Sequence, residues 1–251
     1  MLDSSDFFFE PYKDKRVINH PGFTVGMSGS LLIATHKKTE KKYIVKHTFP
    51  HNAANEYVAC WLAEKINVPA PKAYLLSPDK AFASRYAVAI EFIDGLRSFS
   101  KKDTPNELKS DLITQFAFYL MLRLDDIIQM GRTDDHIFSY DFSEGFNIVD
   151  LRYILKASDE LMGFFLQSPL QNFKMYTQKE NFDLAVIIAE ELHMDYDELK
   201  NGMISTIRRA TDITDDELHA LSEELTKMYP MAIAAYYEEC IRAIRQKAQT
   251  L

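Results

Sequence analysis

The sequence has few cysteines, few glycines and no long apolar run. Its 251 residues include only two cysteines and eight glycines. Cys60 and Cys240 have the spacing of neither a metal site nor a redox pair, so we expect two buried thiols in a reducing cytoplasm. The scarcity of glycine argues against long disordered tracts.

No segment resembles a membrane span or a signal peptide. The longest apolar stretch, residues 113–122, ends at Arg123, whereas a spanning helix needs roughly 20 apolar residues. The first six residues lack the basic start of a signal peptide, and the apolar residues 7–9 are too few for its core. We therefore predict a cytoplasmic protein without a membrane partner.

The chain is acidic, with 37 aspartates and glutamates against 29 lysines and arginines, a net charge of −8. Such a surface repels phosphate backbones, so a nucleic acid is not the expected partner. The length suits one large domain or two closely packed lobes.

Residue patterns in the first part of the chain predict strands and one helix. Apolar and β-branched runs at 31–34, 42–45, 73–76 and 86–92 are typical of strands. Residues 36–41 form the expected turn between the first two. Helical spacing over 55–66 predicts a helix that ends before Pro69.

The rest of the chain is expected to be mainly helical. A helix is predicted over 107–130, followed by a polar stretch at 131–136 and a hairpin at 137–149 that turns at 143–145. Thr214 and Glu217 have the spacing of a capping box, which marks a helix start. This order predicts an α+β protein with a two-lobed protein-kinase-like fold, divided into 1–94 and 95–251, and a cleft between the lobes is a common ligand site.

A glycine-rich segment precedes the first predicted strand. Gly26, Ser28, Gly29 and Ser30 are small enough for backbone amides to approach phosphate oxygens closely. The same residues also fit an ordinary turn entering a strand.

Lys46 ends an apolar strand, where an unpaired charge is costly, so it needs an anion. Glu56 follows near the start of the predicted helix. A strand lysine held by a helix glutamate and reaching ATP phosphates is a kinase arrangement. The alternative is a surface lysine at a strand end.

Two acidic positions follow the long predicted helix. Asp134 lies in the sequence Thr-Asp-Asp-His, and Asp150 follows the predicted hairpin. Kinases need one aspartate near the acceptor hydroxyl and another on Mg²⁺. A solvated acidic loop is the alternative for residues 133–136.

These features occur in kinase order, and several short stretches resemble HipA-type serine/threonine kinases. Asn55-Glu56-Tyr57 and the run at 87–92 resemble the first lobe of that family, and residues 133–136 resemble its catalytic loop. The resemblance covers about residues 23–155.

The resemblance implies the following roles. Lys46 contacts ATP phosphates, Glu56 orients Lys46, and Asp134 is the catalytic aspartate. Asp150 binds Mg²⁺, with Ser139 at a second metal position. The backbone at Glu91, Phe92 and Ile93 binds adenine, the glycine-rich segment contacts ATP, and Ser28 and Ser30 are candidate autophosphorylation sites.

The match departs from the family in two places. Ser139 stands where the family has an asparagine metal ligand, and a hydroxyl is a weaker ligand for Mg²⁺. Asp141 or His136 could compensate, one metal could suffice, or the protein could bind nucleotide as a pseudokinase.

Little more than twenty residues precede the glycine-rich segment, so we expect a minimal form lacking the N-terminal toxin segment. Such a form would work alone or with a separate antitoxin-like protein.

Three functions remain open at this stage. The first is a Mg²⁺–ATP protein serine/threonine kinase with an unknown protein acceptor. The second is a small-molecule kinase of the aminoglycoside or choline type, since an acidic protein could attract a cationic acceptor. The third is a non-catalytic nucleotide-binding or interaction module.

Overall fold

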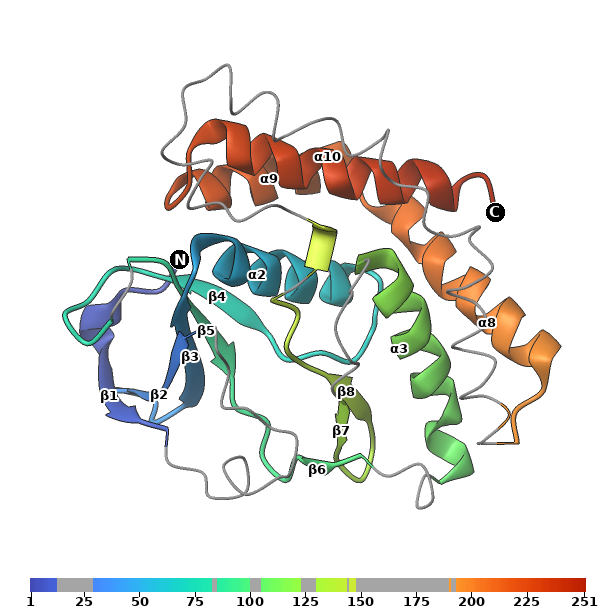
Figure 1. Ribbon diagram of the computed structural model, residues 1–251, viewed down its shortest axis with the longest axis horizontal. Coiled ribbons are helices and arrows are strands. Elements are labelled where there is room, and N and C mark those ends of the chain that lie inside the picture. Colours follow the sequence, from blue (N-terminus) through green and yellow to red (C-terminus); the bar gives the residue numbers. More distant parts are fainter. Residues whose placement is uncertain are drawn as a thin grey trace.

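The structure is a computed structural model. It describes residues 1–12, 29–82, 85–99, 105–122, 130–143, 145–147, 190 and 193–251, with backbone alone at 29, 30, 48, 98 and 147. Within these ranges the predicted α+β class is confirmed: a sheet and one helix come first, and helices dominate later (Figure 1).

A five-stranded antiparallel sheet occupies the first part of the chain. Its strand order is β1-β2-β3-β5-β4, and the four strands predicted from the sequence are all present. The bounds are β1 Phe7–Pro11, β2 Gly29–His36, β3 Lys42–Thr48, β4 Ala73–Leu76 and β5 Ala87–Glu91. The sequence analysis missed β1, whose apolar residues 7–9 were considered only as a possible signal segment.

The sheet has two different apolar faces, as the two-residue period of a strand requires. Ala87 and Ala89 belong to a small cluster with Phe7 and Val45. Val88 on the same strand belongs to the large core that contains helix α2. Lys46 lies directly opposite Val88 in the β3–β5 register, so it shares the face that carries α2.

The N-terminus links the two outer strands of this sheet. The Leu2 amide donates to the Leu75 carbonyl at 2.8 Å, and the Ser77 amide donates to the Leu2 carbonyl at 3.0 Å. Leu2 thereby forms a parallel bridge with β4, while β1, a few residues later, pairs with β2. A short 3₁₀ helix, η1 Ser4–Asp6, connects the two contacts.

Helix α2, Pro50–Lys65, begins with proline in its first turn, where the missing amide proton is not needed. It is buried on most of its surface because it lies between the sheet and the C-terminal helices α9 and α10 (Figure 1). A helix covered on both sides is expected to be apolar all round. Ala53, Val58 and Leu62 accordingly have no exposure.

The described helices after the sheet are α3 Lys109–Leu122, α8 Tyr196–Arg208, α9 Asp215–Thr226 and α10 Met231–Ala248. Short 3₁₀ turns are η3 Asn106–Leu108, η4 Gly145–Asn147 and η6 Arg209–Asp212. One large apolar cluster joins these helices to α2 and to the sheet. In the described ranges no helix is long and apolar enough to cross a membrane.

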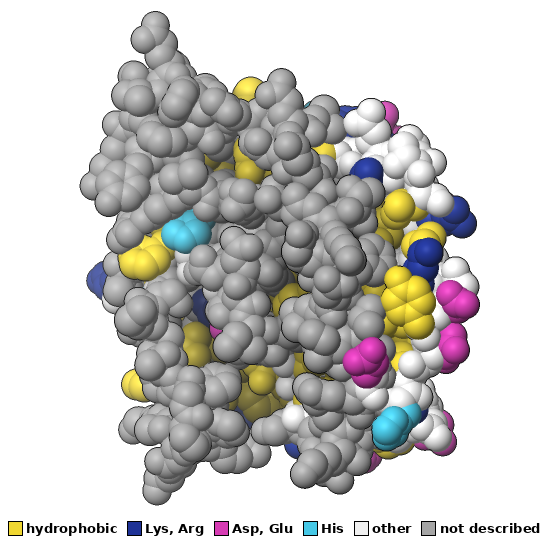
Figure 2. All heavy atoms as spheres, turned by 45° about the vertical axis from the view of Figure 1, so that its right-hand side comes forward, with side chains coloured by type: hydrophobic (Ala, Val, Ile, Leu, Met, Phe, Trp, Pro, Cys, Tyr) yellow, Lys and Arg dark blue, Asp and Glu magenta, His cyan; other side chains and the backbone are white. Residues whose placement is uncertain are grey.

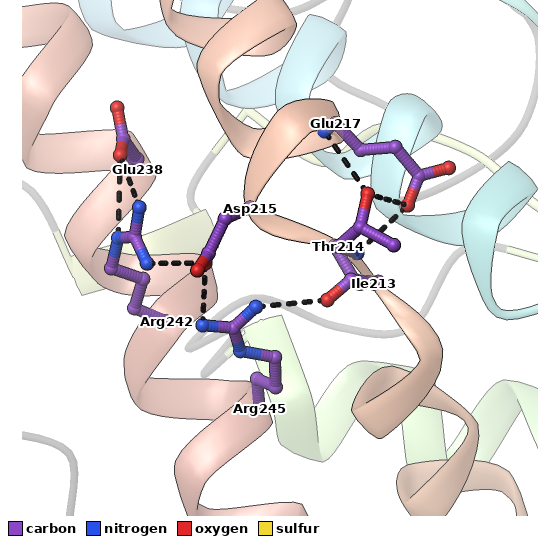
Figure 3. A network of polar contacts seen from close by, with 7 residues as sticks. All are labelled: Ile213, Thr214, Asp215, Glu217, Glu238, Arg242 and Arg245. Carbon is purple, nitrogen blue, oxygen red and sulfur yellow. Dashed lines mark hydrogen bonds and ion pairs between the residues drawn. The ribbon is translucent and has the colours of Figure 1, made fainter.

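Helices α9 and α10 are tied together by a polar network (Figure 3). The predicted capping box is confirmed, with Thr214 and Glu217 satisfying each other's backbone amides. Asp215 accepts hydrogen bonds from Arg242 at 2.6 Å and Arg245 at 2.8 Å. Arg245 also donates to the Ile213 carbonyl at 2.9 Å, so α10 anchors the start of α9.

Two expectations for the middle of the chain were wrong. The helix predicted over 107–130 cannot reach its end, because Met130 begins strand β7, Met130–Arg132. The hairpin lies earlier than predicted: β7 pairs with β8, Ile137–Ser139, around a turn at 133–136. Strand β6, Arg97–Ser98, completes this second sheet. The turn predicted at 143–145 does not fit η4, which begins at Gly145 and in which Phe146 has a φ of 61°.

On the face drawn in Figure 2, apolar, basic and acidic side chains of the described residues are interspersed. The described part of that face therefore offers no patch of a single charge sign.

Candidate functional site

A cluster of three charged side chains lies between the five-stranded sheet and α2. Lys46 of β3 forms an ion pair with Glu56 of α2, whose side chain is 1% exposed. The structure thus brings together the lysine and the glutamate that the sequence paired. The contact follows from local structure, since Lys46 faces α2 and Glu56 lies in the second turn of that helix.

Asp141 completes the cluster from the segment after β8. Its carboxylate accepts from the Lys46 ammonium at 2.9 Å and from the Ser143 hydroxyl at 3.0 Å. Asp141 has a φ of 68°, a left-handed conformation that aspartate tolerates better than most residues. A residue held in this sparsely populated region is often functional, because the surroundings must enforce it.

The segment that carries Asp141 is fixed by α2. The Phe142 amide donates to the Glu56 carboxylate at 3.0 Å, and the Asn55 amide group donates to the Ser143 carbonyl at 2.7 Å. The Phe142 ring is fully buried and makes an edge contact with Phe118 of α3. Helix α2 therefore positions both Lys46 and Asp141.

The ionisation of the three groups is coupled. Burial raises the pKa of Glu56 to about 7, even though Lys46 pulls in the opposite direction. Burial lowers the pKa of Lys46, but the carboxylates of Glu56 and Asp141 outweigh it and the net shift is upward. Burial likewise raises the pKa of Asp141, and Lys46 with Ser143 outweighs it, so this pKa falls below its usual range.

The cluster is suited to a cationic ligand on its Asp141 side. When all three groups are ionised, one ammonium faces two carboxylates, which leaves one negative charge. Asp141 is 33% exposed, so a ligand can reach its carboxylate, whereas Glu56 is covered. No group of three or more potential metal-ligating side chains occurs in the described ranges. Mg²⁺ in nucleotide sites needs only one or two carboxylates besides phosphate and water.

Asp134 is not brought to this cluster. It lies in the β7–β8 turn with its side chain 86% exposed, where it pairs with Arg97 of β6. Asp141 lies beyond the other end of β8, and a strand rises about 3.3 Å per residue, so on the order of 10 Å separates the two aspartates. The turn itself is held by Asp111 of α3, which accepts from the Ile137 amide at 2.9 Å.

Ser139 lies in the interior of the protein. Its side chain is fully buried, and its hydroxyl donates to the Gln115 side chain at 2.5 Å. A hydroxyl committed to a buried partner is poorly placed as a metal ligand. His136, the other side chain considered there, lies in the exposed turn at 3.2 Å from Asp111.

The segment after β5 uses part of its backbone internally. The Glu91 amide donates to the Lys72 carbonyl at 2.8 Å, and the Phe92 amide donates to the Lys42 carbonyl at 3.1 Å. The Glu91 carboxylate accepts from Lys41 at 2.5 Å and from Tyr74 at 2.9 Å. These two amides are therefore committed, so any adenine contact would use the carbonyls of this segment or the amide of Ile93.

Several predicted site residues lie outside the described ranges. Gly26, Ser28 and Asp150 are among them. Gly29 and Ser30 are described as backbone only, at the start of β2 opposite Thr48 and His47.

Asp141, Phe142 and Ser143 lie at the candidate site, and the sequence carries a further signal for them. They follow a short strand and resemble the Asp-Phe-Gly sequence that holds Mg²⁺ in protein kinases, with serine in place of glycine. That tripeptide was the available signal. The tripeptide lies within residues 137–149, for which the sequence pattern predicts a hairpin instead.

The chain is similar to solved structures of known proteins, among them a bacterial kinase. The proinflammatory kinase CtkA of Helicobacter pylori is similar over 100% of this chain and 99% of its own, with 17% sequence identity and a TM-score of 0.45. No protein-family model matches the chain, and no curated protein matches it.

Proposed function

We propose that this protein is an ATP-dependent phosphotransferase, most simply a HipA-like protein serine/threonine kinase. The observation that carries the proposal is the position of Lys46 between Glu56 and Asp141. Kinases use a strand lysine held by a helix glutamate, together with a metal-binding aspartate, to hold ATP. The five-stranded sheet with α2 between β3 and β4 supplies the matching framework.

Each residue of the cluster has a distinct role in this proposal. Lys46 donates to ATP phosphate oxygens, and Glu56 keeps its ammonium oriented. Asp141, with its lowered pKa and exposed carboxylate, is the residue that would hold Mg²⁺. The metal would neutralise charge on the phosphates during transfer. Asp141 replaces Asp150 and Ser139 in this assignment because it contacts Lys46 directly.

Nucleotide binding is tested by thermal unfolding with and without Mg²⁺–ATP. A ligand at a hundred times its dissociation constant stabilises by roughly 2.7 kcal/mol, enough to raise the melting temperature by a few degrees. We expect this shift in the wild type and in Asp150→Asn, and its loss in Asp141→Asn. If only Asp150→Asn lost the shift, the metal would belong to Asp150. No shift in the wild type at millimolar nucleotide would refute the proposal.

The acceptor could instead be a cationic small molecule, because the chain carries a net charge of −8. The two acceptor classes are separated by measuring ATP consumption with amino sugars and amino alcohols, and with serine- or threonine-containing peptides. Turnover raised only by the small molecules would replace the protein-kinase assignment.

A further inference from the structure

Tyr237 of α10 makes a buried contact with the helix that carries Glu56. Its hydroxyl donates to the Asn55 side-chain oxygen at 2.6 Å, and both side chains are almost completely buried. Burial raises the pKa of Tyr237 far above its usual range, so this hydroxyl remains a donor. The contact joins residues 182 positions apart in the sequence.

Asn55 also contacts the segment that contains Asp141. The nitrogen of its amide group donates to the Ser143 carbonyl at 2.7 Å while its oxygen accepts from Tyr237. A carbonyl can only accept and a tyrosine hydroxyl can donate, so the two partners together determine which way the amide faces. Without the hydroxyl, the Asn55 amide group loses one of these two contacts and is held only by the Ser143 carbonyl within the pair.

The same C-terminal region also holds both ends of α2. At the start of the helix, the Tyr229 hydroxyl donates to the Pro50 carbonyl at 2.9 Å. At the end of the helix, Arg209 donates to the Ile66 carbonyl at 3.2 Å, and Lys65 pairs with Glu217 at 2.7 Å. Of these contacts, the central one, through Asn55, continues to the Asp141 segment.

We propose that Tyr237 is a positioning residue for Asp141. Acting through Asn55, it fixes the Ser143 carbonyl and hence the three-residue segment 141–143, which carries the carboxylate proposed to bind the metal. The C-terminal helix thus sets the geometry of the nucleotide site without touching the nucleotide. This inference rests on the proposed function, because it assigns Tyr237 to the same site.

The test measures the affinity for fluorescent mant-ADP with and without Mg²⁺. Tyr237→Phe keeps the ring and removes only the hydroxyl. We expect the Mg²⁺-dependent gain in affinity to fall by about fivefold, the equivalent of one lost hydrogen bond. The Mg²⁺-free affinity should stay within about twofold of the wild type, because Lys46 and the sheet are unchanged. If Tyr237 had a purely structural role, its substitution would change the affinities with and without Mg²⁺ by the same factor.

Tyr229→Phe is the matched control. It also removes one buried tyrosine hydroxyl that contacts α2, but its partner is the Pro50 carbonyl in the first turn of the helix rather than Asn55. We expect a comparable loss of melting temperature and an unchanged Mg²⁺ gain. An equal loss of the Mg²⁺ gain in both variants, or no loss in Tyr237→Phe, would overturn the inference.

Asn55→Ala provides a second, independent variant. In this variant the Mg²⁺-dependent gain in affinity should fall by the same factor. Adding Tyr237→Phe should cause no further fall, because both substitutions act through one amide group. Additive losses would overturn the inference. If the wild type itself gains no affinity from Mg²⁺, the proposed function fails first, so the two failures are distinguishable.

Discussion

At the scale of single residues, the proposed function makes the ionisation of Glu56 a link between pH and ATP turnover. Its pKa is raised to about 7 by burial, so a fall in pH through neutrality protonates Glu56 and weakens its ion pair with Lys46. We expect Mg²⁺-dependent ATP turnover to decline as one proton binds near pH 7. Steady-state rates between pH 5.5 and 9 test this, and Glu56→Gln should give a low rate without that transition.

Stability should change with pH in the opposite sense. The pKa of Glu56 is higher in the folded protein than its ordinary value of 4.5. Glu56 therefore stabilises the folded state fully below pH 4.5, and this stabilisation is lost as the pH rises through about 7. Relative to Glu56→Gln, the wild type should lose on the order of 3 kcal/mol of unfolding free energy over this range. Urea denaturation at pH 4.5 and pH 8 measures the difference. A constant difference would mean that the pKa of Glu56 is not raised.

Asp134 and Asp141 should respond differently to substitution. Asp134 pairs with Arg97 beyond the far end of β8, so Asp134→Asn should retain most ATP turnover. Asp141→Asn should lower turnover by roughly a hundredfold, because a metal contributes several kcal/mol to charge stabilisation. Rates with saturating Mg²⁺–ATP provide the comparison.

Loss of turnover in Asp134→Asn would restore the sequence-based assignment of the catalytic aspartate. Retained turnover would direct attention to Asp125 and Asp126, which lie in the sequence between α3 and β7, outside the described residues.

The sequence paired the lysine and the glutamate of the candidate site, but it named Asp141 only as a substitute for Ser139 and did not place it beside Lys46. Lys46 and Glu56 are close along the chain, and strand and helix patterns were enough to pair them. Asp141 meets Lys46 across 95 residues. That contact depends on where β8 ends and on a left-handed backbone at Asp141, neither of which follows from periodicity.

At the scale of elements, the close approach of α8 to α3 depends on Gly202. A Cβ atom there would lie 2.6 Å from the Ile113 Cγ2 atom. Gly202→Ala should therefore destabilise the protein by about 1–3 kcal/mol, despite the better helix propensity of alanine. Equilibrium denaturation measures this.

Ile113→Ala removes the clashing methyl group and supplies the control. In that background Gly202→Ala should cost much less, or become stabilising. An equal loss of unfolding free energy in both backgrounds would show that α3 and α8 separate freely.

Element boundaries were predictable where one pattern dominated. The strands at 73–76 and 87–91 and the capping box at Thr214 follow directly from local residues. The short strands β6, β7 and β8 have two or three residues each, too few for a period of two to emerge. Strand β8 is held by Asp111 and Gln115 of α3, a long-range contact that the sequence alone does not reveal.

At the scale of the whole molecule, one apolar cluster includes both α2 and α10. Cys60 of α2 and Cys240 of α10 are both buried within it. We expect the two thiols to become reactive in one cooperative unfolding event. Pulsed thiol labelling in urea, with Cys60→Ala and Cys240→Ala as single-thiol proteins, should give the same unfolding free energy at each site. Earlier exposure of Cys240 would show that α10 detaches first.

The bridge formed by Leu2 has a consequence for the behaviour of the protein in concentrated solution. Unpaired strand edges are templates on which other chains can add a strand and aggregate. Here the outer strand β4 already receives Leu2, and the same N-terminal segment continues into β1 at the opposite side of the sheet. The first residues of the chain therefore occupy the backbone positions at which an intermolecular sheet would begin to grow.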